Sequence, residues 1–224
     1  MQHTSRAYEA EVNELRAAAV AMGERCRQAL RLALDAFRTG APDLVAEVQG
    51  LDGRVNEDEK AIDALVLRIL ALRQPVASDL RLLMTTLRLV TDLERIGDEA
   101  VNIAERAEQG PCIAHGNVYA DLELMSEEAQ RMVSTALEAF VESDEARARE
   151  VLLRDDVVDE LYGRTLRGMA EYMRTHPTEV PAAMCVISVS KYLERVADHA
   201  TNIAEEVIFM IGGEDVRHQK SVPH

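Results

Sequence analysis

The sequence predicts an all-α protein built as two tandem antiparallel three-helix bundles, and three observations support this fold class. Ala, Leu, Glu and Arg dominate, while the 224 residues include only 11 Gly, 6 Pro and 4% aromatics, a composition that favours helices over sheets. Apolar residues recur at helical spacing along six long segments. A stretch of 13 residues beginning at Leu93 returns at Leu193 with nine identical positions, so the chain is a tandem repeat of one unit.

The first segment is a predicted helix over residues 5–38, because its apolar residues follow a heptad-like spacing. These residues are Leu15, Ala19, Met22, Cys26, Ala29, Ala33 and Phe37. Residues 39–43 contain Gly and Pro, so they end this helix and begin a second one over residues 43–73. Pro75 then stops the second helix.

Two glycines, Gly50 and Gly53, lie inside the second helix, and each costs about 1 kcal/mol relative to Ala. We therefore expect tight packing or a close approach at these positions. A third helix over residues 77–107 carries the first copy of the repeated stretch. Residues 108–117 follow as a linker with two glycines and a proline.

The second half restarts the same pattern with helices over residues 118–142, up to 173, and 180–210. The inward residues of the first of these are Leu122, Met125, Met132, Leu137 and Phe140. Ser143 and Asp144 form a predicted turn and N-cap before the middle helix, and Gly212–Gly213 stops the last one. The predicted units are residues 1–109 and 117–213, followed by a flexible tail over 214–224.

The repeated stretch presents two separate faces when it is drawn as a helix. One face is apolar and predicts a buried seam formed by Leu89, Leu93, Ile96, Ala100 and Ile103, and by Val189, Leu193, Val196, Ala200 and Ile203. The other face is acidic and repeats in register, with Glu94, Asp98, Asn102 and Glu105 matched by Glu194, Asp198, Asn202 and Glu205.

The middle helix of each unit offers acids that complete this acidic face. These residues are Asp52, Asn56, Glu59 and Asp63 in the first unit, and Asp155 and Asp159 in the second, next in line with Tyr162. Each unit thus pairs a D-x-x-x-D/N pattern on its middle helix with an E-x-x-x-D pattern on its last helix. Oxygen ligands from two helices suit hard ions such as Mg, Mn or ferric Fe. A solvated acidic face with i, i+4 ion pairs remains the alternative for any one of these residues.

The composition excludes several classes of function. The formal charge of −15 argues against nucleic-acid binding and against attachment to an anionic membrane. The N-terminal residues contain no apolar signal region, and no apolar run is long enough for membrane insertion. Cys26, Cys112 and Cys185 are widely separated and indicate reduced thiols in a cytoplasmic protein, with Cys26 and Cys185 in the core.

Catalysis finds no support in the sequence. It has no GxSxG, P-loop or HExxH motif, and neither repeat has the Glu-x-x-His spacing of di-iron bundles. His199 directly follows Asp98's counterpart, Asp198, and points to another face of the helix. We therefore predict no catalytic residues and no enzyme.

The doubled Leu-Glu-Arg-[Ile/Val]-[Gly/Ala]-Asp-x-Ala-x-Asn-Ile-Ala-Glu stretch and the upstream acidic patterns resemble the PhoU family of phosphate-uptake regulators. The resemblance covers nearly the whole chain and implies two similar three-helix bundles with multinuclear iron or zinc clusters on the bundle surface. The implied ligands are Asp52, Glu94, Asp98, Asp155, Asp159, Glu194 and Asp198, with Asn102, Asn202, Glu105 and Glu205 as further candidates. Asn56 departs from the acidic pattern, so Glu59 or Asp63 would have to compensate at the first site.

The resemblance also implies a regulatory role. The expected protein is a cytosolic homodimeric adaptor that links a phosphate ABC transporter ATPase to a sensor histidine kinase and keeps the phosphate-starvation response off when phosphate is plentiful. Two alternatives remain open, a carboxylate metal-storage protein without a signalling role and a metal-dependent hydrolase.

Overall fold

The computed structural model describes residues 2–109 and 118–213, and these residues fold into six long helices and two short 3-10 helices. The first half contains α1 (Gln2–Thr39), α2 (Pro42–Arg73), α3 (Ser78–Glu105) and η1 (Arg106–Gln109). The second half contains α4 (Val118–Glu142), α5 (Glu145–Thr175), η2 (Pro177–Glu179) and α6 (Val180–Gly212). The all-α prediction is therefore confirmed, whereas the predicted tail, Cys112 and most of the predicted linker lie outside the described residues.

The helix boundaries lie within about three residues of those that the sequence predicts, because the local stop and start signals act as expected. Asp144 is the N-cap of α5, and its side chain accepts hydrogen bonds from the backbone N–H groups of Ala146 at 2.9 Å and Arg147 at 3.1 Å. Gly213 ends α6 in the left-handed conformation, with φ at 72°.

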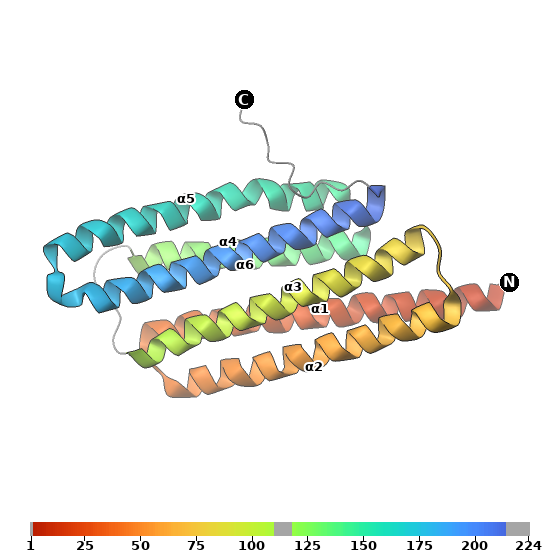
Figure 1. Cartoon of the computed structure of the whole chain (residues 1–224), viewed down its shortest axis with the longest axis horizontal. Helices are drawn as coiled ribbons and strands as arrows, with labels where there is room; N and C mark the ends of the chain where they lie inside the picture. The colour runs from red at the N-terminus through yellow and green to blue at the C-terminus, as the bar shows by residue number, and fades with distance from the viewer. Residues whose placement is uncertain (1, 110–117, 214–224) are drawn as a thin grey trace, which may run out of the picture.

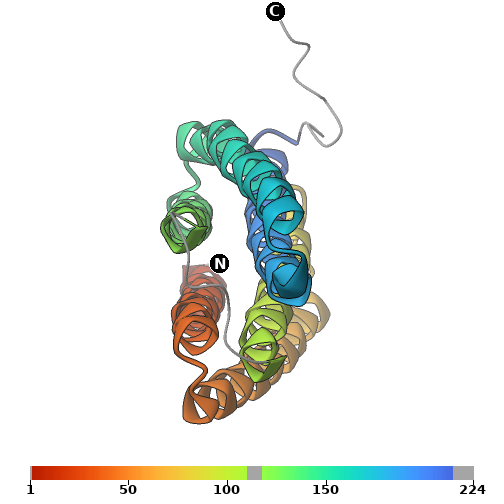
Figure 2. The ribbon, with the colours of Figure 1, turned by 90° about the vertical axis from the view of Figure 1, so that its left-hand side faces the viewer.

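Each half forms an antiparallel three-helix bundle, and the two bundles lie side by side (Figure 1). The end-on view in Figure 2 places α1 and α4 on one side of the molecule and α3 and α6 on the other, with α2 and α5 at opposite edges. The bundles pack on each other through α3 against α6 and α1 against α4. Their buried apolar side chains form one continuous core.

The predicted core residues of α1 and α4 and both seams of the repeated stretch are all buried. Cys26 lies in this core and donates its S–H to the Leu93 carbonyl oxygen at 3.2 Å. The prediction for Cys185 was only partly right, since this side chain packs against the core but is partly exposed. Cys185 lies near the start of α6, close to one end of the bundle.

The expectation of close packing at Gly50 and Gly53 was wrong. Both glycines are exposed, and a Cβ atom added at either position would meet no atom within 4 Å. The close approach occurs instead at Gly23 of α1, where an added Cβ would lie 2.2 Å from Cδ1 of Leu137 in α4. Among the described helices, none is long and apolar enough to cross a membrane.

Candidate functional site

The first acidic site lies where α2 faces α3. Asn56 donates a hydrogen bond from Nδ2 to Asp52 Oδ2 at 3.2 Å, and Thr91 donates to Glu59 Oε1 at 3.4 Å. Gly97 brings the two helices close together, since a Cβ atom added there would lie 3.1 Å from Asp52 Oδ1. That oxygen is buried and has no hydrogen-bond partner in the described structure. An orphaned carboxylate oxygen between two acidic helices is a position that favours a cation.

The carboxylates of this site repel one another. Burial, followed by the charge of Asp98, raises the pKa of Asp52. Burial and then Asp98 also raise the pKa of Glu94, with smaller contributions from Glu59 and Asp52. The acids predicted from α2 and α3 therefore lie within electrostatic range of one another, and a bound cation would relieve their repulsion.

An arginine of the repeated stretch partly neutralises the first site. Arg95 lies 3.3 Å from Asp98 and 3.4 Å from Glu94. The side chain of Arg95 is more than half exposed, so it can swing away when another cation arrives. The position of Arg95 between the two acids in the sequence is the signal that could have predicted this contact.

The second site repeats the first between α5 and α6, with a stronger electrostatic signal. Burial, followed by the charges of Asp159 and Asp198, raises the pKa of Asp155 to about 6. Burial and then Glu194 raise the pKa values of Asp159 and Asp198. The second site has Asp159 where the first site has Asn56, so one more carboxylate raises the pKa values of Asp155 and Asp198 there.

A lysine partly neutralises the second site. Lys191 forms an ion pair with Glu194, and its ammonium group lies 5.4 Å from the centre of the Tyr162 ring. The ring of Tyr162 therefore helps to hold the cation that competes for this site. In the part of the chain that the structure describes, no group of three or more His, Cys, Asp or Glu side chains is gathered closely enough to hold a metal ion. The metal sites consequently remain a prediction, based on paired acids that approach one another from two helices.

The two predicted asparagine ligands turn away from the acidic sites. Asn102 donates to Glu99 Oε2 at 3.2 Å, and Asn202 donates to Asp92 Oδ1 at 3.2 Å. Both contacts lie along the seam between α3 and α6. Asn102 still lines a hollow of about 330 Å³ together with Asp52 and Asp98, so it borders the first site. Glu105 is exposed, while Asp63 and Glu205 are partly buried.

Sequence reasoning missed the polar seam that joins the two bundles. The carboxylate of Glu99 is 2% exposed and forms an ion pair with Arg195 across the seam at 2.9 Å. His199 Nδ1 lies 2.9 Å from Asp92 Oδ1, and because a carboxylate can only accept, this nitrogen carries a hydrogen and donates a hydrogen bond to it. The available signal was the exchange of Glu99 for His199 between the repeats, which marks a face where the two units differ.

A further ion pair closes the same seam. Arg88 Nη1 lies 2.9 Å from both carboxylate oxygens of Glu206, whose side chain is almost fully buried. Arg106 donates to the Tyr192 hydroxyl at 2.9 Å from the other end of the seam. These contacts fix the orientation of α3 against α6, and hence the orientation of the two acidic sites relative to each other.

Comparison with known proteins identifies the repeated unit. The family model for the PhoU domain matches residues 20–107 and again residues 122–207. A Pseudomonas aeruginosa protein named phosphate-specific transport system accessory protein PhoU homolog is 38% identical over 220 residues, covering 96% of this chain and 90% of that protein. The Escherichia coli K12 protein named phosphate-specific transport system accessory protein PhoU is 32% identical over 217 residues, covering 97% and 90%.

Two solved structures share the whole fold. The crystal structure of PhoU from Pseudomonas aeruginosa matches with a TM-score of 0.85 at 37% identity and covers 92% of this chain and 100% of that one. The phosphate transport system regulatory protein PhoU from Streptococcus pneumoniae matches with a TM-score of 0.85 at 25% identity and covers 93% and 99%. The similarity therefore extends over both bundles and over their relative placement.

Proposed function

The chain belongs to the PhoU family, and we propose that it serves as an accessory protein of a phosphate transport system. The observation that carries this proposal is the similarity over nearly the full length of both chains to relatives that bear this name. The duplicated acidic stretch lies inside both matched regions, so the features that distinguish this sequence are the ones it shares with that family.

Within that role, the chain acts as a cytosolic adaptor that restrains phosphate uptake and the phosphate-starvation regulon. One surface contacts the ATPase of the phosphate ABC transporter, and another contacts a sensor histidine kinase. The faces of the two bundles are similar but not identical, which is consistent with a different partner on each. A net charge of −15 favours basic surfaces on these partners. The role consists of binding, so no catalytic step is assigned, and the working form is a homodimer.

The adaptor role is tested by direct association. The purified chain is mixed with the transporter ATPase and with the cytoplasmic part of the kinase, and each mixture is analysed by calorimetry and size exclusion. We expect both proteins to bind, and to bind less tightly as the salt concentration rises from 50 to roughly 200 mM. An absence of association with both partners at micromolar concentrations would contradict the adaptor role.

The acidic sites are proposed to hold metal ions. Asp52, Glu94 and Asp98 would hold an ion at the first site, with Asn56 and Glu59 beside them, and Asp155, Asp159, Glu194 and Asp198 would hold one at the second. The family resemblance favours iron or zinc, while the all-oxygen donor set also suits Mg or Mn. A bound cation would neutralise the repulsion between the acids and tie the middle helix of each bundle to the last.

A variant that removes four of these charges tests the assignment. Glu94→Gln, Asp98→Asn, Glu194→Gln and Asp198→Asn together should abolish the uptake of metal measured by inductively coupled plasma mass spectrometry. Circular dichroism should show unchanged helical content, because these side chains lie outside the core. Unchanged metal content in this variant would rule out these ligands.

A second candidate function is carboxylate metal binding or storage without signalling. The doubled acidic sites, in which Asp155 has a pKa of about 6, favour this alternative because metal binding there requires no partner protein. The association experiment separates the two functions. A storage protein would bind metal stoichiometrically and ignore both the ATPase and the kinase.

A further inference from the structure

A groove of about 810 Å³ runs between α1 and α4, where one bundle meets the other. Figure 2 places these two helices on the side of the molecule opposite α3 and α6, the helices that carry the repeated acidic stretch. It begins beyond the tight contact between Gly23 and Leu137. Polar side chains from both helices line most of the groove.

The floor of the groove is polar although it is buried. Ser126 is 2% exposed and Gln130 is 9% exposed, and Gln130 Nε2 donates to the Ser126 hydroxyl at 3.0 Å. An amide side chain offers two N–H donors and two acceptor sites, so Gln130 can bond to a ligand in addition to Ser126. A buried polar floor costs free energy unless it contacts another polar group, which a bound ligand would supply.

The wall formed by α1 is cationic. Arg27 donates to Glu24 at 2.6 Å and to the Ser134 hydroxyl at 3.4 Å, while its Nε is buried and has no hydrogen-bond partner. Arg31 lies one turn further along the same wall and forms no ion pair with any described residue. Arg38 continues the row, and at 1.5 Å per residue the row extends over about 16 Å.

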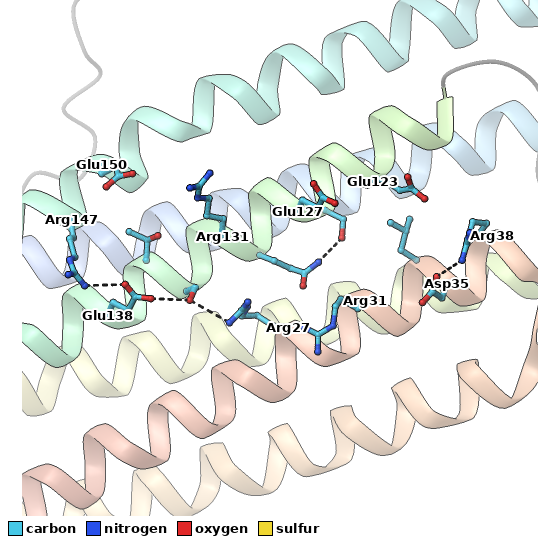
Figure 3. Close-up of a pocket in the computed structure, with 15 residues that line it drawn as sticks. Arg27, Arg31, Asp35, Arg38, Glu123, Glu127, Arg131, Glu138, Arg147 and Glu150 are labelled. Atoms are coloured by element: carbon cyan, nitrogen blue, oxygen red, sulfur yellow. Dashed lines mark hydrogen bonds and ion pairs between the residues drawn. The ribbon is translucent and has the colours of Figure 1, made fainter.

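Two acids of the groove form ion pairs with its own arginines, and two others lie on α4 (Figure 3). Asp35 pairs with Arg38 at 2.9 Å, and Glu138 pairs with Arg147 at 3.1 Å. Glu123 and Glu127 lie on α4. The lining as a whole contains five arginines and five acids and is therefore neutral, in a chain with a net charge of −15.

We propose that this groove binds a small anion that carries several phosphate groups in a row. Arg27 and Arg31 would donate to the phosphate oxygens, and Gln130 and Ser134 would contact the anion from the floor. The planar guanidinium fork matches the spacing of phosphate oxygens, and a row of arginines fits a chain of phosphates better than a single one. Two kinds of molecule share this chemistry, a nucleoside triphosphate and an inorganic polyphosphate.

Calorimetric titration tests the proposal on the full chain. The protein is first passed over a chelating resin, so that no metal can bridge a phosphate to the acidic sites. The probes are ATP, inorganic tripolyphosphate, adenosine and citrate at 50 mM salt. We expect both phosphate chains to bind at one site per chain, and adenosine not to bind.

Variants then locate the site. Arg31→Ala should weaken tripolyphosphate binding by at least about tenfold, the expected result of losing charge-assisted hydrogen bonds. Arg31→Lys, which keeps the charge but loses the fork, should lose less. Arg174→Ala removes another exposed arginine, from the far end of α5, and should leave the affinity unchanged.

The relative affinities for ATP and tripolyphosphate distinguish the two kinds of ligand. Equal affinity for ATP and tripolyphosphate means that the phosphate chain carries the recognition, and tighter binding of ATP means that the nucleoside adds to it. The proposal is overturned if neither phosphate binds at millimolar concentration, if citrate binds as tightly as tripolyphosphate, or if Arg31→Ala binds like the unchanged protein.

Discussion

Asp155 lies in an environment that raises its pKa well above that of an ordinary surface carboxylate. It is partly buried and faces the charges of Asp159 and Asp198, which together with burial raise its pKa to about 6. A carboxyl group held in this state makes the folded protein less stable at neutral pH, because its charged form is disfavoured only in the folded state. The same repulsion makes the site receptive to a cation.

Removing the charge of Asp155 should stabilise the metal-free protein. The full shift of the pKa corresponds to about 3 kcal/mol, and solvent screening of a half-exposed group reduces the expected gain to about 1 kcal/mol at pH 7 for Asp155→Asn. Urea denaturation of the metal-free protein measures this gain. In the presence of a bound metal the order should reverse, because the variant has lost a ligand.

The sign of the pH dependence follows from the raised pKa. The folded protein binds the proton of Asp155 more tightly than the unfolded chain, so this group contributes stability below pH 3.8 that is lost as the pH rises through about 6. The free energy of unfolding should therefore increase as the pH falls from 7 to 5, and Asp155→Asn should flatten this slope. A variant with the same pH dependence as the unchanged protein would contradict the assigned pKa.

At the residue scale, helical spacing predicted which acids approach one another and missed what neutralises them. Glu94 and Asp98 share a stripe that spacing alone reveals, and Asp52 faces them as expected. Spacing places Asn102 within reach of Glu99, three residues earlier on α3, but it could not show that Glu99 is buried against Arg195 of α6. The orientation of a side chain at the border between two stripes is decided by tertiary packing.

At the element scale, the helices are set by local signals, and the distances between them are set by a few small residues. Gly23 permits the close contact of α1 with α4, and Gly97 permits that of α3 with α2. In the second bundle Ala197 takes the place of Gly97. Gly50 and Gly53 were selected from the sequence instead. The sequence shows that a glycine inside a helix lowers helix stability, but it does not show which residues of other helices pack against it.

Two glycine substitutions should change stability in opposite directions. Gly53→Ala lies on an exposed helix face with free space around it, so it should raise the free energy of unfolding by about 1 kcal/mol through helix propensity. Gly23→Val would push into Leu137 and should lower it by about 2 kcal/mol. Thermal and urea denaturation measure both changes.

The matched control for Gly23→Val is the double variant with Leu137→Ala, which makes room for the added side chain. Gly23→Val should lower the free energy of unfolding less in the Leu137→Ala background than in the unchanged protein. A Gly23→Val variant as stable as the unchanged protein would mean that the α1–α4 contact is looser than described.

The helix boundaries were predictable because each break carries Pro, Gly or a capping residue, as at Pro42, Asp144 and Gly213. The pairing of α3 with α6 was not predictable in the same way. Short connections predict that three consecutive helices form an antiparallel bundle. The docking of one bundle on the other depends instead on which partly polar helix faces of the two bundles are complementary.

At the scale of the whole molecule, the polar seam holds the two bundles in one arrangement. Glu99 is almost fully buried, and its charge is compensated from the other bundle by Arg195 at 2.9 Å. Burial raises the pKa of Glu99, while Asn102 and Arg195 act to lower it. The loss of Arg195 would leave a buried carboxylate with an amide as its remaining close partner.

Arg195→Ala should therefore destabilise the molecule by about 2 kcal/mol at pH 7, since it strands the charge of Glu99. Urea denaturation measures the loss. The matched control is Arg95→Ala, the same position in the first repeat, whose exposed ion pairs are worth about 0.5 kcal/mol. Equal effects of the two substitutions would mean that the seam does not depend on this pair.

We propose that this chain restrains the response to phosphate starvation, and alkaline phosphatase activity in the source organism tests this role most directly. The activity is measured in phosphate-replete medium in cells with the gene, without it, and with it restored on a plasmid. The account predicts low activity with the gene, high activity after its deletion, and low activity again on restoration. Low activity in the deletion strain would contradict the claim.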